Sequence, residues 1–136
     1  MSMKKISEAI LGVGVDDTTI DLFESQYPVP TGVSYNSYVI LDEKTTILDT
    51  VDARATGPWL ENLAEALGGC KPAYLVVSHM EPDHGANVAK LAALYPEMQV
   101  VSGWKMTGQL AGLGIMLVGV ALLLAVLAIY NATYQD

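Results

Sequence analysis

The chain has 136 residues and a formal net charge of −8, which is enough for one small domain with a core of moderate size. The charge is uneven, because residues 1–102 contain six Lys/Arg and fourteen Asp/Glu, whereas residues 103–136 contain only Lys105 and Asp136. This acidity argues against nucleic acid as a partner, since binding to a phosphate backbone requires clustered Lys and Arg. The single cysteine and an N-terminus without a secretory signal pattern indicate the cytoplasm.

Short runs of strand-forming residues, separated by turn residues, fill the first fifty positions. Asp16 and Asp17 favour a turn, and two prolines with a glycine in residues 27–32 predict a loop. Tyr, Val and Ile are frequent on both sides of a polar turn at residues 42–44, which predicts a hairpin. We therefore expect strands at residues 6–15, 20–24, 33–41 and 45–49.

Helices alternate with strands in the second half of the chain. Pro58 suits the first position of a helix, and Gly68 favours its end. A strand at residues 73–78 is apolar almost throughout, as in a strand that is covered on both faces. A further helix near residues 85–95 and a last strand at residues 99–102 complete an α/β layer architecture. The first helix would bury an apolar stripe of Trp59, Leu60, Leu63, Ala64 and Leu67.

Four candidate metal ligands follow the apolar strand within six residues: His79, Glu81, Asp83 and His84. Alternate residues of an extended stretch share a side, so His79, Glu81 and Asp83 would point into one pocket. Imidazole and carboxylate groups suit iron, manganese or zinc, and a cation would relieve the repulsion between neighbouring carboxylates. The alternative is a solvated acidic turn, in which Asp83 caps the following helix and both histidines bond to nearby carbonyls.

The stretch YLVVSHMEPDHGAN resembles the metal-binding signature of the flavodiiron proteins, a branch of the metallo-β-lactamase fold. The stretches IDLFESQYPVPTGVSYNSYVILDEKTTILDTVD and WLENLAEALGG resemble the N-terminal region of the same family, so that the resemblance covers residues 5–102. Glu81 stands where hydrolases of this fold usually carry histidine, which is the mark of the iron-binding branch. The resemblance implies an α/β fold, the first part of a metallo-β-lactamase-like αββα sandwich.

The resemblance also implies a division of labour among the four ligands. His79 and Glu81 would bind one iron and Asp83 the second, while His84 either ligates or stands aside. Such a di-iron centre reduces dioxygen to water or nitric oxide to nitrous oxide. The family uses FMN, which a flavodoxin-like domain carries, and it implies a redox partner protein and a homo-oligomer.

The sequence departs from this pattern beyond residue 102. The family completes its site with two further histidines and a bridging carboxylate, but the chain has no histidine besides His79 and His84 and no phosphate-binding loop for FMN. We therefore expect a truncated reductase domain that is not active alone. Two alternatives stay open: a non-catalytic, membrane-attached module that binds at most one metal, and a metallo-hydrolase of the β-lactamase fold.

The last part of the chain has a different character, and the resemblance ends before it. Residues 110–130 form a 21-residue run without a charged side chain, which is long enough for a transmembrane helix and apolar on every face. We consider three interpretations of residues 103–136: a membrane anchor, a chimeric, frameshifted or engineered end, and a helix buried in a soluble core. Lys105, which flanks the run, places the N-terminal domain in the cytoplasm if the run is an anchor.

Overall fold

The computed structural model describes residues 3–103 and 122–125, and the chain divides into two units, Met1–Ser102 and Gly103–Asp136. In the second unit, residues 122–125 form a helical turn on which Leu122, Leu123 and Leu124 are each at least 60% exposed. Across the residues that the structure describes, no helix is both long and apolar enough to cross a bilayer. Apart from that turn, the transmembrane helix predicted at residues 110–130 lies outside the described residues.

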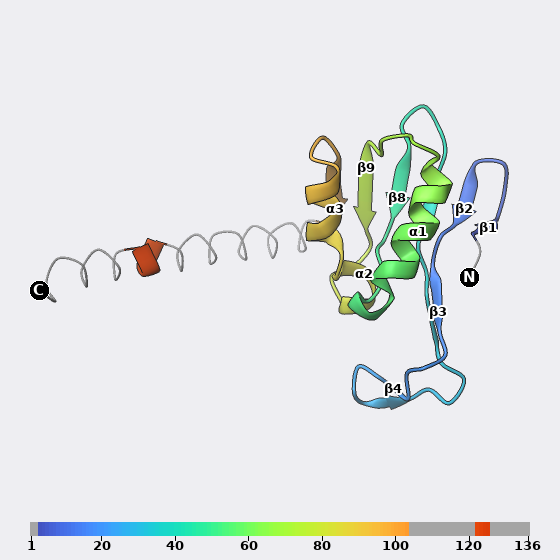
Figure 1. The fold of residues 1–136 in the computed structure, drawn as a ribbon, viewed down its shortest axis with the longest axis vertical. Helices are drawn as coiled ribbons and strands as arrows, with labels where there is room; N and C mark the ends of the chain where they lie inside the picture. Colours follow the sequence, from blue (N-terminus) through green and yellow to red (C-terminus); the bar gives the residue numbers. More distant parts are fainter. Residues whose placement is uncertain (1–2, 104–121, 126–136) are drawn as a thin grey trace, which may run out of the picture. The chain divides into compact units, whose positions relative to one another are not determined.

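A six-stranded mixed sheet forms the centre of the first unit (Figure 1). Its strands, in order across the sheet, are β1 (Lys4–Lys5), β2 (Ile10–Gly12), β7 (Tyr38–Ile40), β8 (Thr46–Leu48), β9 (Tyr74–Val77) and β10 (Gln99–Ser102). Neighbours are antiparallel from β1 to β8, whereas β8, β9 and β10 run parallel. The predicted hairpin of β7 and β8 is therefore confirmed, and so is the α/β architecture.

Two short ladders lie outside this sheet. β3 (Val15–Asp17) pairs with β6 (Val33–Tyr35), and β4 (Leu22–Phe23) pairs with β5 (Tyr27–Pro28). The predicted turn at Asp16 and Asp17 is wrong, because pairing with β6 keeps both residues extended and the Ser34 hydroxyl donates to the Asp16 carboxylate at 2.7 Å. The strand predicted at residues 33–41 is divided into β6 and β7, and each half belongs to a different ladder.

The division between β2 and β3 occurs at Gly14, within the strand predicted at residues 6–15. A Cβ atom at Gly14 would clash with the carbonyl oxygen of Tyr35, so only glycine allows the two backbones to approach this closely. The ladders beyond this point extend away from the main sheet in Figure 1. They carry the β4–β5 hairpin past the carboxyl ends of β8 and β9.

Four helical segments follow the hairpins: η1 (Ala53–Ala55), α1 (Thr56–Leu67), α2 (Pro82–Gly85) and α3 (Val88–Leu94). α1 begins two residues before Pro58, which the first turn accommodates because its N–H groups have no partners within the helix. Gly68, at φ 56°, ends α1 as predicted. The buried stripe differs from the prediction, since Ala64 is exposed and Leu60 only half-buried, and it consists of Trp59, Asn62, Leu63, Ala66 and Leu67.

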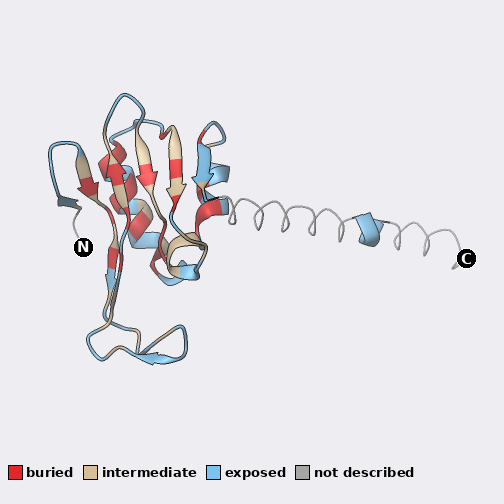
Figure 2. Cartoon of the chain, turned by 180° about the vertical axis from the view of Figure 1, so that it is seen from behind, coloured by how far each residue is buried: buried red, intermediate tan, exposed pale blue. Residues whose placement is uncertain are grey.

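The hydrophobic core lies between α1, α3 and one face of the sheet, and Figure 2 shows the other face. Strand register places buried side chains in one row across four strands, from Leu11 through Val39 and Ile47 to Leu75. β9 was predicted to be covered on both faces, but only Leu75 and Val77 are buried, while Tyr74 and Val76 are half-buried on the opposite face. The sheet is therefore covered by helices on one side.

Candidate metal centre

The candidate ligands follow β9, and the short helix α2 begins among them. Pro82 begins α2, so Asp83 and His84 lie in a helical turn, with Glu81 at its N-cap in an extended conformation. The prediction of an extended stretch over residues 79–83 is therefore wrong. Asp83 does not cap α2 either, because it lies inside the first turn.

The turn brings three of the four predicted ligands together. Ligand atoms of His79, Asp83 and His84 all lie within 4.8 Å of one another, and they form the one such group among the residues that the structure describes. His84 Nε2 is 3.3 Å from Asp83 Oδ2, and the rings of His79 and His84 are 4.1 Å apart between centroids, tilted by 48°. All three residues are partly buried, so the cluster is accessible to an ion from solution.

Glu81 lies outside this cluster. Its side chain is 67% exposed, and its carboxylate oxygen Oε2 is 3.7 Å from His79 Nδ1. Glu81 is the extended N-cap residue of α2 whereas Asp83 lies in its first turn, so the alternation that would have placed both carboxylates on one side does not hold. As a ligand, Glu81 therefore stays a prediction, and its side chain would have to reorient to reach the cluster.

Asp49 is a residue of the site that the sequence patterns did not reveal. It follows β8, and its carboxylate accepts hydrogen bonds from the Ser78 backbone N–H at 2.6 Å and from the Ser78 hydroxyl at 2.7 Å. Its Oδ2 atom also lies 3.1 Å from His84 Nδ1. The available signal was its place at the carboxyl end of a strand, since the carboxyl ends of parallel strands meet at one edge of the sheet, where sites usually lie.

A second residue without a signal in the sequence, Thr50, fixes the end of α2. Its backbone N–H and its hydroxyl both donate to the carbonyl oxygen of His84, at 2.9 and 2.6 Å. The same hydroxyl accepts from the Asn87 N–H at 3.2 Å, and the Asn87 side chain donates to the carbonyl of Val51 at 2.7 Å. Thr50 is fully buried and Asn87 nearly so, which makes this a rigid support beneath the cluster.

Two polar atoms of the cluster are buried without a hydrogen bond among the described residues, Asp83 Oδ1 and His84 Nδ1. The His84 nitrogen lies 3.1 Å from the Asp49 carboxylate, whereas Asp83 Oδ1 has no hydrogen-bond partner among the described residues. Buried carboxylate oxygens are normally paired with a donor or a cation. An ion with imidazole and oxygen ligands, such as iron, manganese or zinc, fits this set of groups.

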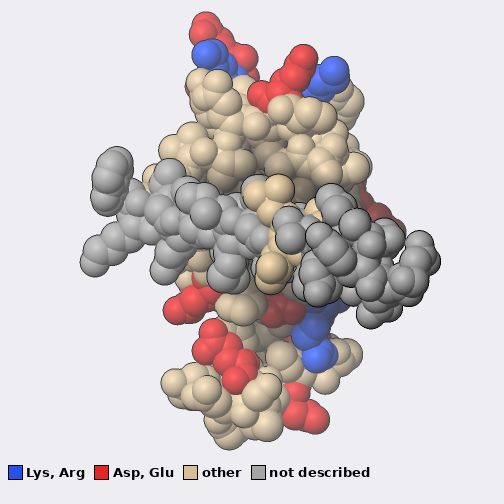
Figure 3. Space-filling model, turned by 90° about the vertical axis from the view of Figure 1, so that its left-hand side faces the viewer, with Lys and Arg blue, Asp and Glu red and all other residues tan. Residues whose placement is uncertain are grey.

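The cluster of His79, Asp83 and His84 has a cavity beside it. A cavity of about 430 Å³ adjoins the cluster, and it lies between the β4–β5 hairpin and α2, with Phe23, Glu24, Asp52 and Asp83 among its lining residues. In the lower part of Figure 3, where this hairpin lies, the charged atoms are mostly acidic. A concentration of carboxylates raises the local concentration of cations.

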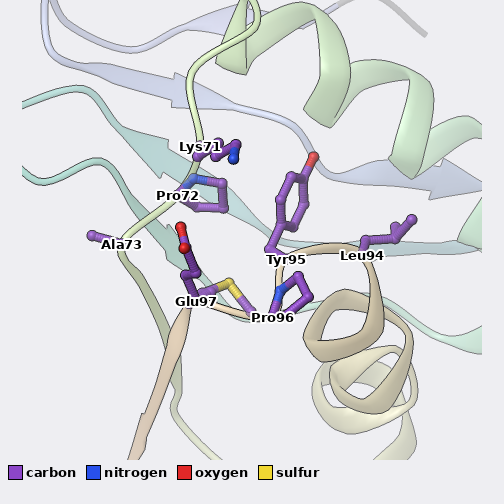
Figure 4. A pocket seen from close by; sticks show the side chains of 8 residues that line it. Lys71, Pro72, Ala73, Leu94, Tyr95, Pro96 and Glu97 are labelled. Atoms are coloured by element: carbon purple, nitrogen blue, oxygen red, sulfur yellow. The ribbon is translucent and has the colours of Figure 1, made fainter.

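A larger cavity, of about 530 Å³ and shown in Figure 4, lies at the opposite end of the strands. Residues just before β9 and β10, including Pro72, Tyr95 and Met98, line it. It is therefore at the amino ends of these strands, remote from the loop that follows β9. Its size does not make it the functional site, because the chemically reactive side chains gather at the other edge.

Two ionisable groups on the hairpin side have shifted pKa values. Burial raises the pKa of Tyr35, with a smaller contribution from the carboxylates of Asp52 and Asp17, and its hydroxyl has no hydrogen-bond partner among the described residues. The pKa of Asp17 is lowered, first by hydrogen bonds from Thr19 and then by Arg54, whose guanidinium lies 3.1 Å away. Both shifts follow from local packing and hydrogen bonding.

Comparison with known proteins identifies the class of fold. The structure is similar to a subclass B3 metallo-β-lactamase of Bradyrhizobium japonicum, with a TM-score of 0.52 and 18% identity over 76% of this chain and 33% of that chain. Identity at this level shows the fold alone. The first unit thus has a metallo-β-lactamase-like fold, with its candidate ligands at the expected edge of the sheet.

The particular relatives are flavodiiron proteins, whose N-terminal metallo-β-lactamase-like domain matches about 70% of this chain. A rubredoxin-oxygen oxidoreductase of Megalodesulfovibrio gigas is 39% identical over 98 residues, which are 71% of this chain and 24% of the relative. An anaerobic nitric oxide reductase flavorubredoxin of Klebsiella pneumoniae is 31% identical over 96 residues, 70% of this chain and 20% of the relative. The flavodiiron protein of Giardia intestinalis has a TM-score of 0.72 and 27% identity over 79% of this chain and 26% of that structure.

These matches align with the N-terminal metallo-β-lactamase-like domain of flavodiiron proteins, and the chain spans about a quarter of the length of the curated relatives it matches. A different model, described as a family of unknown function (DUF6903), matches residues 98–135. The chain therefore combines a flavodiiron-type region with a C-terminal segment that matches a different family model.

Proposed function

We propose that residues 5–102 serve as the metal-binding part of a flavodiiron-type reductase of dioxygen or nitric oxide. The observation that carries this proposal is the convergence of His79, Asp83 and His84 within 4.8 Å behind β9, in a chain whose relatives include an oxygen oxidoreductase and a nitric oxide reductase. These three residues would hold iron, with Glu81 joining after its side chain reorients. Iron held at this place would supply one-electron transfer to a small oxidant.

The described residues support one cation at this site. Two imidazoles and one carboxylate converge, and Glu81 would add a fourth donor only after its side chain reorients, whereas a pair of ions needs more ligands. Turnover would therefore require ligands, FMN and an electron donor in addition to the described residues. A module that binds one metal without catalysis is the competing function, and the same geometry supports it.

Iron titration under anaerobic conditions tests this proposal on the full chain, kept in mild detergent. We expect close to one ferrous ion per chain, and a loss of binding in the double variant Asp83→Ala/His84→Ala. Glu97→Ala is a matched control, because this carboxylate lies by the remote cavity. Equal iron content in the double variant and the wild type would refute the assignment of the site, and about two ions per chain would favour a complete di-iron centre.

We further propose that residues 110–130 anchor the chain in a membrane, with the N-terminal unit in the cytoplasm. Support comes from the 21-residue uncharged run and from the helical turn at residues 122–125, whose leucines are exposed. A family model that matches residues 98–135 favours a genuine segment over a frameshifted end. Flotation of the full chain with phosphatidylcholine vesicles tests this, and failure to float would contradict the anchor.

A further inference from the structure

Asp49 has an unusual backbone conformation for a residue that follows a strand. Its φ angle is 56°, in the left-handed region that Asp and Asn enter more readily than other residues with a side chain. Its N–H donates to the carbonyl of Val76 at 2.8 Å, which joins the end of β8 to β9. The left-handed turn thus directs the Asp49 carboxylate along the edge of the sheet, toward Ser78, which precedes the candidate ligands.

Two buried side chains, Ser37 and Trp59, stabilise this conformation of Asp49. The hydroxyl of Ser37 donates to the carbonyl oxygen of Asp49 at 2.8 Å, and the indole N–H of Trp59 donates to the same hydroxyl at 3.0 Å. Ser37 is 1% exposed and Trp59 is 0% exposed, so neither has water as an alternative partner. The backbone of Asp49 is therefore fixed to the core by two successive hydrogen bonds.

The Asp49 carboxylate has little freedom of its own. Both of its oxygens accept hydrogen bonds from Ser78, and Oδ2 is 3.1 Å from His84 Nδ1. It is not part of the group of atoms that could hold an ion, which consists of His79, Asp83 and His84. On the opposite side of the imidazole ring, His84 Nε2 faces Asp83 at 3.3 Å. The carboxylate therefore acts on the cluster through His84.

We propose that Asp49 is the positioning residue of the cation site, which it prepares by fixing the tautomer of His84. Asp49 Oδ2 lies 3.1 Å from His84 Nδ1, closer than Asp83 Oδ2 lies to Nε2 at 3.3 Å, and a small rotation of the ring would align the first contact as a hydrogen bond. A carboxylate only accepts hydrogen bonds, so Asp49 favours the imidazole with its proton on Nδ1. The lone pair then lies on Nε2, on the side of Asp83, where a cation would bind. This is the general relation between a metal-bound histidine and its outer hydrogen-bond partner. The inference rests on the proposed metal-binding function.

Asp49→Asn separates this role from a purely structural one. Asn tolerates the left-handed conformation, and its amide oxygen can still accept from the Ser78 N–H. Its NH2 group would then face His84 Nδ1 as a donor, which favours the proton on Nε2. The substitution therefore keeps the fold and reverses the tautomer. Ser78→Ala is the matched control, because it removes one hydrogen bond to Asp49 and leaves the charge beside His84.

Imidazole nitrogen chemical shifts in the metal-free full chain, measured by NMR near pH 8.5, test the tautomer directly, and the chain has only two histidines to assign. We expect Nδ1–H at His84 in the wild type and in Ser78→Ala, and Nε2–H in Asp49→Asn. An unchanged His84 tautomer in Asp49→Asn would overturn the proposal. This readout needs no metal, so it stands even if the wild type binds none.

Cobalt(II) binding, followed by visible absorption, tests the consequence for the site. Loss of an outer partner of a metal-bound histidine typically weakens binding by about 10–100-fold, and we expect this loss in Asp49→Asn. Ser78→Ala should lose much less, and the urea midpoint of Asp49→Asn should stay close to that of the wild type. Binding by Asp49→Asn within twofold of the wild type would overturn the positioning role. Absence of cobalt binding by the wild type would instead overturn the proposed function.

Discussion

Thr50→Val should destabilise the chain although the two side chains have nearly the same shape. Thr50 is fully buried, so the substitution creates no cavity but removes a hydroxyl that donates to the His84 carbonyl and accepts from the Asn87 N–H. The carbonyl keeps a second donor, the Thr50 N–H at 2.9 Å. The Asn87 N–H is left buried without an acceptor, and such a group costs about 1–3 kcal/mol.

Urea unfolding of the full chain in detergent, followed by circular dichroism, measures this loss. With a slope of roughly 2 kcal/mol per molar urea, the midpoint should fall by about 0.5–1.5 M while the slope stays unchanged. Thr46→Val is the control, because its hydroxyl donates to Lys44 at an exposed position and its loss should change little. If Thr50→Val and Thr46→Val unfold at the same midpoint, the buried network does not support α2.

Three further substitutions probe the hairpin side of the domain. Tyr35→Phe should leave stability at pH 7 equal or higher, because the hydroxyl is buried without a partner among the described residues. The raised pKa of Tyr35 makes folding less favourable above pH 10, so the variant should lose less stability than the wild type in alkaline urea titrations. The lowered pKa of Asp17 contributes stability above pH 3.8 that is lost as the pH falls, so Asp17→Asn should flatten the acid limb of the stability curve. Gly14→Ala should destabilise strongly in a thermal melt, because its methyl group meets the Tyr35 carbonyl.

Elements with strong local signals could be predicted from the sequence. The strand at residues 99–102 has the predicted bounds, and the hairpin around residues 42–44 is present. Both are short apolar or β-branched runs beside turn residues, which is local information. Asp16 and Asp17 were predicted wrongly because their extended conformation depends on β6, eighteen residues further along the chain. Tertiary pairing overrides the local preference of aspartate for turns.

Residues 79–84, which carry the candidate ligands, show the same limit of local sequence information, and the cause is one proline. The four candidate ligands could be selected by residue type, but the three that converge are His79, Asp83 and His84, with His84 in place of Glu81. The alternation argument failed because Pro82 begins a helical turn, which rotates Asp83 and His84 onto the side of His79 and leaves Glu81 outside. Asp49 and Thr50 could not be found by spacing, since they lie about thirty residues away and reach the site only through the pairing of β8 with β9.

That pairing sets the geometry of the whole site. β8 and β9 align Ile47 with Leu75 and Leu48 with Val76, and the next residues beyond each strand include Asp49 and Ser78. A slip of one residue would turn Ile47 and Leu75 out of the core and move Asp49 away from both Ser78 and His84. The register is held by burial, since Ile47 and Leu75 are completely buried beneath the helices. The hydrophobic row that stabilises the sheet therefore also positions the groups that prepare His84 for a cation.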